Sequence, residues 1–138
     1  MKVLKTLVIS VLLCSLVVPV YAAKKQTKST LRIKKIAEPM IDNILKGFAL
    51  DDYLIYSRDL AENLKVTGAR TKFFQVGRNI HNNLGNYVDR EFMGILNKQG
   101  MTMILWKANF DQTENDVLIK LVISRENKRY VVSGLWLQ

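Results

Sequence analysis

The hydrophobic pattern of this chain changes its period once, close to Gly85, and no other feature constrains the fold as strongly. Before Gly85, apolar residues recur at steps of three and four, a spacing that places them on one face of an α-helix. After Gly85, apolar and polar residues alternate in short runs separated by turn-forming residues, as in half-buried strands. Because the helices come first and the strands follow, we predict an α+β domain with an antiparallel sheet.

The first predicted helix covers residues 29–49. Pro39 lies within it and removes one backbone donor, so we expect either a kink or a helix start near Glu38. The apolar face of this helix consists of Ile33, Ile36, Ala37, Met40, Ile41, Ile44, Leu45 and Phe48.

Two further helices are predicted before the period changes. Asp51 and Asp52 can cap a short second helix that carries Tyr53, Leu54, Tyr56 and Leu60. The third helix covers residues 69–84, and Gly85 is placed to end it in a left-handed conformation. The inner stripe of the third helix consists of Phe73, Val76, Ile80 and Leu84.

Four strands are predicted after Gly85, over residues 87–97, 101–110, 117–125 and 130–137. The turns between them are short, so consecutive strands pair antiparallel. The helices can cover one face of this sheet. Because the last two strands are apolar on much of both faces, we expect the other face to be partly buried in a partner subunit.

Residues 1–22 have the order of a cleavable secretory signal peptide. Lys2 and Lys5 precede an uncharged, largely aliphatic run, Pro19 breaks that run, and cleavage is predicted after Ala22. The alternative is an uncleaved membrane anchor, for which the uncharged stretch is at the short limit. We therefore expect an exported protein, periplasmic or extracellular, with no transmembrane anchor after cleavage.

Cleavage would also remove the only cysteine, Cys14, so no disulfide, thiol chemistry or lipid attachment is expected in the mature chain. The net charge of +9 is concentrated in a basic lead, residues 23–35, ahead of a nearly neutral domain, residues 36–138. That lead contains no aromatic residue, so nucleic-acid binding is not expected. It is interpreted as a solvated segment, with weak attraction to an anionic surface as the alternative.

Several short motifs resemble one family. They are Ala-Glu-Pro-x-x-Asp-Asn-Ile-Leu at residues 37–45, Asp-Tyr-x-x-Tyr-Ser-x-Asp-Leu at residues 52–60, Leu84-Gly85, and the closing Ser-Gly-Leu-Trp at residues 133–136. The chain resembles small bacterial domains of unknown function in the NTF2-like (cystatin-like) superfamily, in the group with a C-terminal Gly-Leu-Trp motif. The resemblance implies a cone: N-terminal helices packed on a curved four-stranded antiparallel sheet, a cavity at the open end, and frequent dimerisation through the sheet. It brings no assigned activity, and the fold hosts several functions.

Five aromatic residues are candidates for the lining of that cavity. Their ordinary role is to fill the core, and the alternative is to bind a small apolar ligand. These residues are Tyr56, Phe73, Trp106, Phe110 and Trp136.

Catalytic chemistry has little support in the sequence. His81 is the only histidine and has no nucleophile or carboxylate at a fixed spacing, so it is interpreted as a surface residue. No metal site or cofactor is expected, because the mature chain offers no set of His and Cys ligands. An isomerase-like site would have to draw on Tyr53, Tyr56, Asp59, Tyr87 and Asp89.

The sequence thus favours an exported, non-enzymatic domain that binds a small apolar ligand or a peptide in its cavity. The second hypothesis is a structural protein that forms a homodimer through its sheet or joins an envelope protein partner. An isomerase or hydratase is the third hypothesis.

Overall fold

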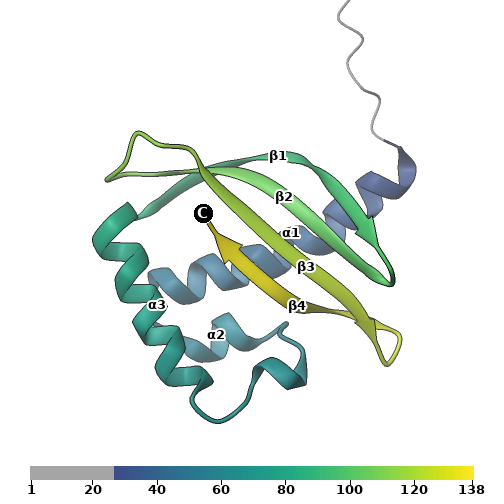
Figure 1. The fold of residues 1–138 in the computed structure, drawn as a ribbon, viewed down its shortest axis with the longest axis horizontal. Helices are drawn as coiled ribbons and strands as arrows, with labels where there is room; N and C mark the ends of the chain where they lie inside the picture. Colours follow the sequence, from purple (N-terminus) through teal and green to yellow (C-terminus); the bar gives the residue numbers. More distant parts are fainter. Residues whose placement is uncertain (1–26) are drawn as a thin grey trace, which may run out of the picture.

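The computed structural model describes residues 27–138, so the predicted signal peptide and the start of the basic lead lie outside the described residues. Within this range three α-helices pack against a four-stranded antiparallel sheet, which confirms the predicted α+β class (Figure 1). The elements are α1 (Lys28–Ala49), α2 (Tyr53–Ser57), the 3₁₀ helix η1 (Glu62–Leu64), α3 (Ala69–Leu84), β1 (Tyr87–Lys98), β2 (Met101–Phe110), β3 (Val117–Glu126) and β4 (Arg129–Leu137).

Helix α1 is continuous through Pro39, so the alternative that it begins near Glu38 is wrong. It begins after Thr27, whose side chain caps it by accepting the backbone N–H of Thr30. Pro39 and Lys35, whose carbonyl loses its helical partner at Pro39, are both exposed. Water can therefore satisfy that carbonyl, while the opposite face of the helix stays packed on the sheet.

Helix α2 is capped as predicted but is shorter than predicted. The Asp52 carboxylate accepts the N–H groups of the second and third residues of the helix. The predicted extension to Leu60 is wrong, because the chain leaves the helix to pair with β4. The N–H of Val132 donates to the carbonyl of Asp59 (2.7 Å), and the N–H of Ala61 donates to the carbonyl of Val132 (2.8 Å).

Helix α3 has the predicted bounds and ends at Gly85, whose φ is positive (+83°) as predicted, but its ψ of −145° lies outside the left-handed helical region, so that part of the prediction is wrong. A side chain at Gly85 would be strained by that backbone conformation. A Cβ atom there would also overlap with the side chains of Asp111 and Gln112 in the turn between β2 and β3. Gly85 therefore allows the chain to pass closely from α3 into β1.

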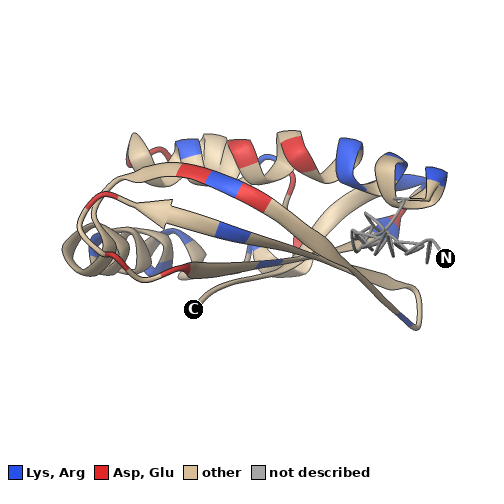
Figure 2. Ribbon diagram, turned by 90° about the horizontal axis from the view of Figure 1, so that it is seen from above, with Lys and Arg blue, Asp and Glu red and all other residues tan. Residues whose placement is uncertain are grey.

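The sheet has the order β1-β2-β3-β4, with every neighbouring pair antiparallel, and its strands match the predicted ranges to within one residue. Register shifts interrupt β1 at Tyr87/Asp89 and at Phe92/Gly94, and another occurs beside Val122/Ile123 in the pairing of β3 with β4. Helix α1 lies along one face of the sheet (Figure 2). We call this the inner face and the opposite one the outer face.

The core lies between α1 and the inner face. Residues at alternate positions of β2 and β3 meet the apolar stripe of α1, as the two periods require. Each large side chain that is fully buried there contributes about 2 kcal/mol to stability. The fully buried large side chains of this core are Trp106, Ile41, Ile44, Ile104, Ile119, Leu121, Ile123 and Val132.

The outer face of the sheet is also rich in apolar side chains. Trp106 faces inward, so the intervening residues of β2, Met101, Met103 and Leu105, face outward. Leu96 pairs with Met103 in the register of β1 and β2 and is 58% exposed. This outer face extends to Trp136 on β4.

Candidate functional site

A cluster of aromatic rings joins the end of α1 to α2 and α3. The ring centroids of Tyr56 and Phe73 lie 4.7 Å apart, and those of Phe48 and Phe73 lie 5.3 Å apart. Gly47 makes this approach possible, because a Cβ atom there would lie 2.6 Å from Cβ of Tyr56. The cluster is therefore held by close contact between helix backbones as well as by the rings themselves.

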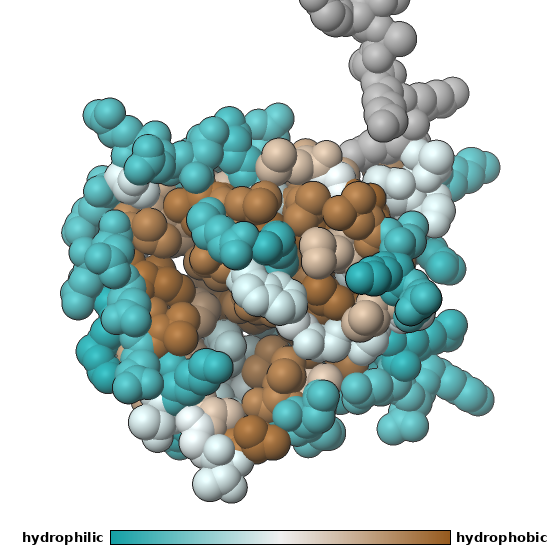
Figure 3. Space-filling view, in the orientation of Figure 1, coloured by the Kyte–Doolittle hydropathy of each residue, from teal (hydrophilic) through white to brown (hydrophobic). Residues whose placement is uncertain are grey.

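These rings form one wall of a hollow of about 600 Å³ that opens between α2, α3 and the edge strand β4. We call it the aromatic groove. Figure 3 shows apolar side chains gathered in the hollow between the hydrophilic rim of α3 and the strands. The groove is lined by Phe48, Tyr53, Tyr56, Leu60, Leu64, Ala69, Lys72, Phe73, Val76, Asn79, Ile80 and the β4 residues from Val132 to Leu137.

The structure divides the five predicted cavity residues into two groups. Tyr56, Phe73 and Trp136 line the aromatic groove. Trp106 and Phe110 lie instead in the closed core, where they are 0% and 4% exposed. Both side chains point to the inner face of β2, which α1 covers, so neither can reach the groove.

Sequence reasoning missed two parts of the groove. Lys72 stands directly before Phe73 on α3 and, among residues 27–138, is the only charged side chain that lines the groove. The other part is the backbone of β4 between Ser133 and Leu137. No sequence motif marks either part. Both line the groove only because α3 packs opposite the edge of the sheet.

Trp136 marks the rim of the groove. It is 47% exposed, and its ring lies over Gly134, where a Cβ atom would come within 2.6 Å of the indole. Lys120 on the neighbouring strand places its ammonium nitrogen 5.9 Å from the indole centroid, a favourable cation–π position. The outer face is therefore basic and aromatic beside the groove.

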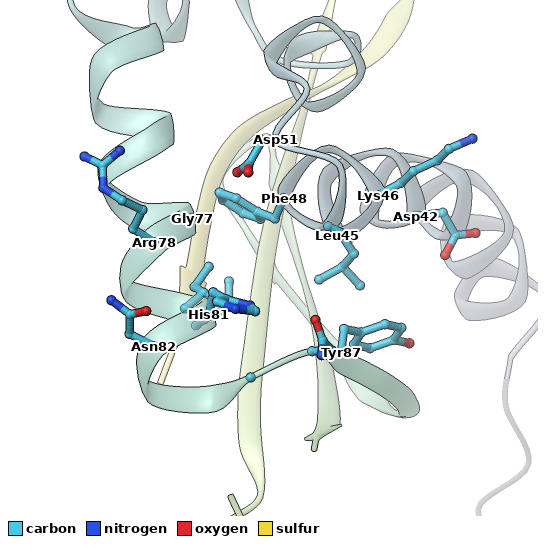
Figure 4. Close-up of a pocket in the computed structure, with 15 residues that line it drawn as sticks. Asp42, Leu45, Lys46, Phe48, Asp51, Gly77, Arg78, His81, Asn82 and Tyr87 are labelled. Carbon is cyan, nitrogen blue, oxygen red and sulfur yellow. The ribbon is translucent and has the colours of Figure 1, made fainter. Parts of the chain in front are cut away.

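A second, more polar hollow of about 510 Å³ lies between α1, α3 and the start of β1. His81 points into it together with Leu45 and Asp51, whereas Arg78 and Asn82 point away (Figure 4). His81 is exposed, and among residues 27–138 those that line this hollow include no Ser, Thr or Cys. Its described lining therefore gives His81 no aliphatic hydroxyl or thiol to activate.

A partly buried cluster of charged residues joins α1 to β1. Arg90, whose side chain is only 11% exposed, donates to the carboxylates of Glu38 and Asp42 and to the hydroxyl of Tyr87. The Glu38 carboxylate also accepts the indole N–H of Trp106 (3.2 Å). Burial opposes the charge of Arg90, but its bonds to the two carboxylates outweigh this and raise its pKa above the ordinary value. The cluster fixes the helix to the sheet.

The remaining candidate acids have structural partners of their own. Asp59 accepts from the side-chain amide of Asn43 (2.8 Å), and Asp89 accepts from that of Asn109 (2.6 Å). Tyr56 lines the aromatic groove but Asp59 does not, so this pair does not share a cavity. Among residues 27–138, no three His, Cys, Asp or Glu side chains are grouped as a metal site would require.

Fold and groove together define a class: an α+β domain whose helices cover one face of an antiparallel sheet and form an aromatic groove at its edge. Comparisons with protein-family models, curated proteins and solved structures found no significant match. In the part of the chain that the structure describes, no helix is long and apolar enough to cross a membrane.

Proposed function

We propose that this protein is an exported, non-enzymatic binding protein of the NTF2-like type, and that its aromatic groove takes a small apolar ligand or a peptide. The observation that supports this most directly is the wall of aromatic rings beside an open hollow of about 600 Å³. This volume lies within the range of roughly 300–1,000 Å³ found for small-molecule sites.

The groove suits binding for two physical reasons. Its rings are held by packing between α1, α2 and α3, so a ligand does not have to organise the aromatic wall itself. Burial, with a smaller contribution from Tyr53, raises the pKa of Tyr56 above 10.0. This direction fits a largely dry wall, in which the neutral Tyr56 hydroxyl can form hydrogen bonds with a ligand.

The test uses a fluorescent dansylated fatty acid as the probe. Val76→Arg places a charge in the groove wall and is expected to weaken probe binding by about tenfold or more. Val88→Arg is the matched control, because Val88 is an exposed valine on β1 outside the groove. Binding that is absent in the wild type, or equal in both variants, would contradict the proposal.

Export is tested separately by the mass and N-terminal sequence of the protein recovered from its host. The expected mature chain begins at Ala23. A chain that retains residues 1–22 would contradict cleavage.

A second candidate function is assembly through the sheet, which the apolar outer face favours. Leu96 and Met101 are 58% and 44% exposed there. If this face pairs two copies, the wild type elutes as a dimer in sizing chromatography, and Leu96→Glu shifts it to a monomer. A monomeric wild type would contradict the dimer.

A further inference from the structure

We propose that the aromatic groove takes its partner as an extended peptide, which adds a strand to the open edge of β4. In this arrangement the peptide directs apolar side chains into the groove and acidic side chains toward the outer face. This inference rests on the proposed function, because it requires the groove to be a binding site, and it specifies the class of partner.

The hydrogen-bond register shows which backbone groups of β4 face away from the sheet. Leu118 and Gln138 exchange both backbone bonds, with distances of 2.6 and 3.0 Å. Such pairs alternate along an antiparallel ladder, so Trp136 and Gly134 also direct their backbone groups toward β3. Leu135 and Leu137 lie between them, so their N–H and C=O groups point away from β3, in the plane of the sheet, toward the open edge. The described residues provide no hydrogen-bond partner for these groups.

The chain already uses the neighbouring part of this edge in the proposed way. Residues 59–61 run parallel to β4, and Leu60 forms a bridge with Val132 through two backbone hydrogen bonds. After Ala61 the chain turns into η1 and leaves the edge. The edge therefore accepts an extended segment at Val132 and remains open beyond it, over residues 133–137.

The groove follows the same open stretch. Its lining includes β4 from Val132 to Leu137 on one side and Phe73 and Val76 of α3 on the other. A strand paired with β4 would lie about 4.8 Å from it. Its alternate side chains would then reach the aromatic wall.

The charges beside the groove specify the other side chains of the peptide. Lys72 lines the groove, and in the part of the chain that the structure describes no acidic side chain does. Lys120 lies beside Trp136 on the outer face, next to the same edge. A peptide in which apolar residues alternate with acidic residues places the apolar ones in the groove and the acidic ones beside Lys120, while Lys72 adds longer-range attraction from the groove wall.

The probe is a fluorescein-labelled peptide, Glu-Val-Glu-Leu-Glu-Val-Glu, with blocked ends, and its binding is measured by fluorescence anisotropy. Two further peptides carry N-methyl groups, one on the Glu amides and the other on the Val and Leu amides. In an added strand only one of these sets donates to β4: the Glu amides if the peptide runs parallel, the Val and Leu amides if it runs antiparallel. We expect one N-methylated peptide to bind about tenfold or more weakly and the other to keep most of its affinity.

Equal binding of the two N-methylated peptides would overturn strand addition. So would the absence of binding by the unmodified peptide up to about 1 mM. If the dansylated fatty acid still binds and Val76→Arg still weakens it, the groove remains a ligand site and only strand addition fails. A dimer in sizing chromatography together with no binding of the peptide would overturn the peptide partner and point to a second copy at the edge.

Discussion

The two edges of the sheet are finished in different ways. Along β1, the consecutive charged residues Asp89, Arg90 and Glu91 follow one register shift and precede another, and Arg90 is tied to α1. Along β4, the residues from Val131 to Leu137 carry no charge. One sheet thus has a charged, bulged edge fastened to a helix and an uncharged edge beside an aromatic groove.

This difference separates stability from binding in one small domain. Charged residues and bulges are the usual means by which proteins prevent an edge strand from pairing with other chains. Both edges are interrupted by register shifts, that of β4 at Ser133, but only β1 also carries charged residues, and the uncharged end of β4 is an aggregation risk. We infer that β4 is left open because the edge is used, and the following variants test each side of the contrast.

The largest effect is expected on the β1 side. Arg90→Met removes the partner of two carboxylates and leaves Glu38 beside the indole of Trp106 without its cation. Because that cation is nearly buried, we expect a loss of about 3 kcal/mol in the free energy of unfolding, measured by urea denaturation. The groove lies on the other side of the domain, so the surviving folded protein should bind the dansylated probe normally.

Lys107→Met is the control for this experiment. Lys107 also lies near two carboxylates, but its contacts to Glu91 and Asp116 are 3.9 and 3.7 Å long and lie at the surface. Such pairs contribute little, so a loss below about 0.5 kcal/mol is expected. Similar losses in the free energy of unfolding for both variants would contradict the stabilising role assigned to the Arg90 cluster on β1.

The next effect is on the frame of the groove. Gly47→Ala places a Cβ atom against the backbone of α2 at Tyr56, with no flexible side chain to move aside. We expect a loss of about 2 kcal/mol together with weaker probe binding, because α2 and its rings are displaced. Gly77→Ala is the matched control, since its Cβ would lie 3.4 Å from a ring atom of Phe48, near ordinary contact. Equal losses in the two variants would contradict the close packing of α1 on α2.

Periodicity predicted most of this fold, because elements held by their own amphipathic patterns can be located from local sequence. The end of α2 could not be predicted, since it depends on the pairing of Asp59 and Ala61 with Val132 far along the chain. The same reason applies to the site. Trp106 and Trp136 are both tryptophans on strands, and the sequence does not distinguish them. Trp106 lies in the core because α1 covers its side of the sheet, whereas Trp136 lies at the rim of the groove.

A smaller effect tests the charge of the groove. Lys72→Glu is expected to weaken binding of the acidic peptide about fivefold, with little change in stability, because Lys72 is exposed. Lys46→Glu makes the same charge change on α1, outside the groove, and should alter binding much less. The difference should shrink as salt is added. Equal effects would indicate attraction to the net charge of the protein rather than to the groove.

The smallest effect concerns the dryness of the aromatic wall. Burial raises the pKa of Tyr56 above 10.0, so the unfolded chain loses this proton first as the pH rises. Between the unfolded and folded pKa values the folded state binds more protons, and the stability from Tyr56 is complete below pH 10.0 and falls above it. Tyr56→Phe should therefore make the free energy of unfolding less dependent on pH above 10, in urea titrations at stepped pH. Tyr130→Phe removes a phenol outside the groove and is the matched control. If both variants reduce the pH dependence equally, Tyr56 is no more shielded from water than Tyr130. The aromatic groove beside β4 would then lack the dry wall that favours binding of an apolar ligand.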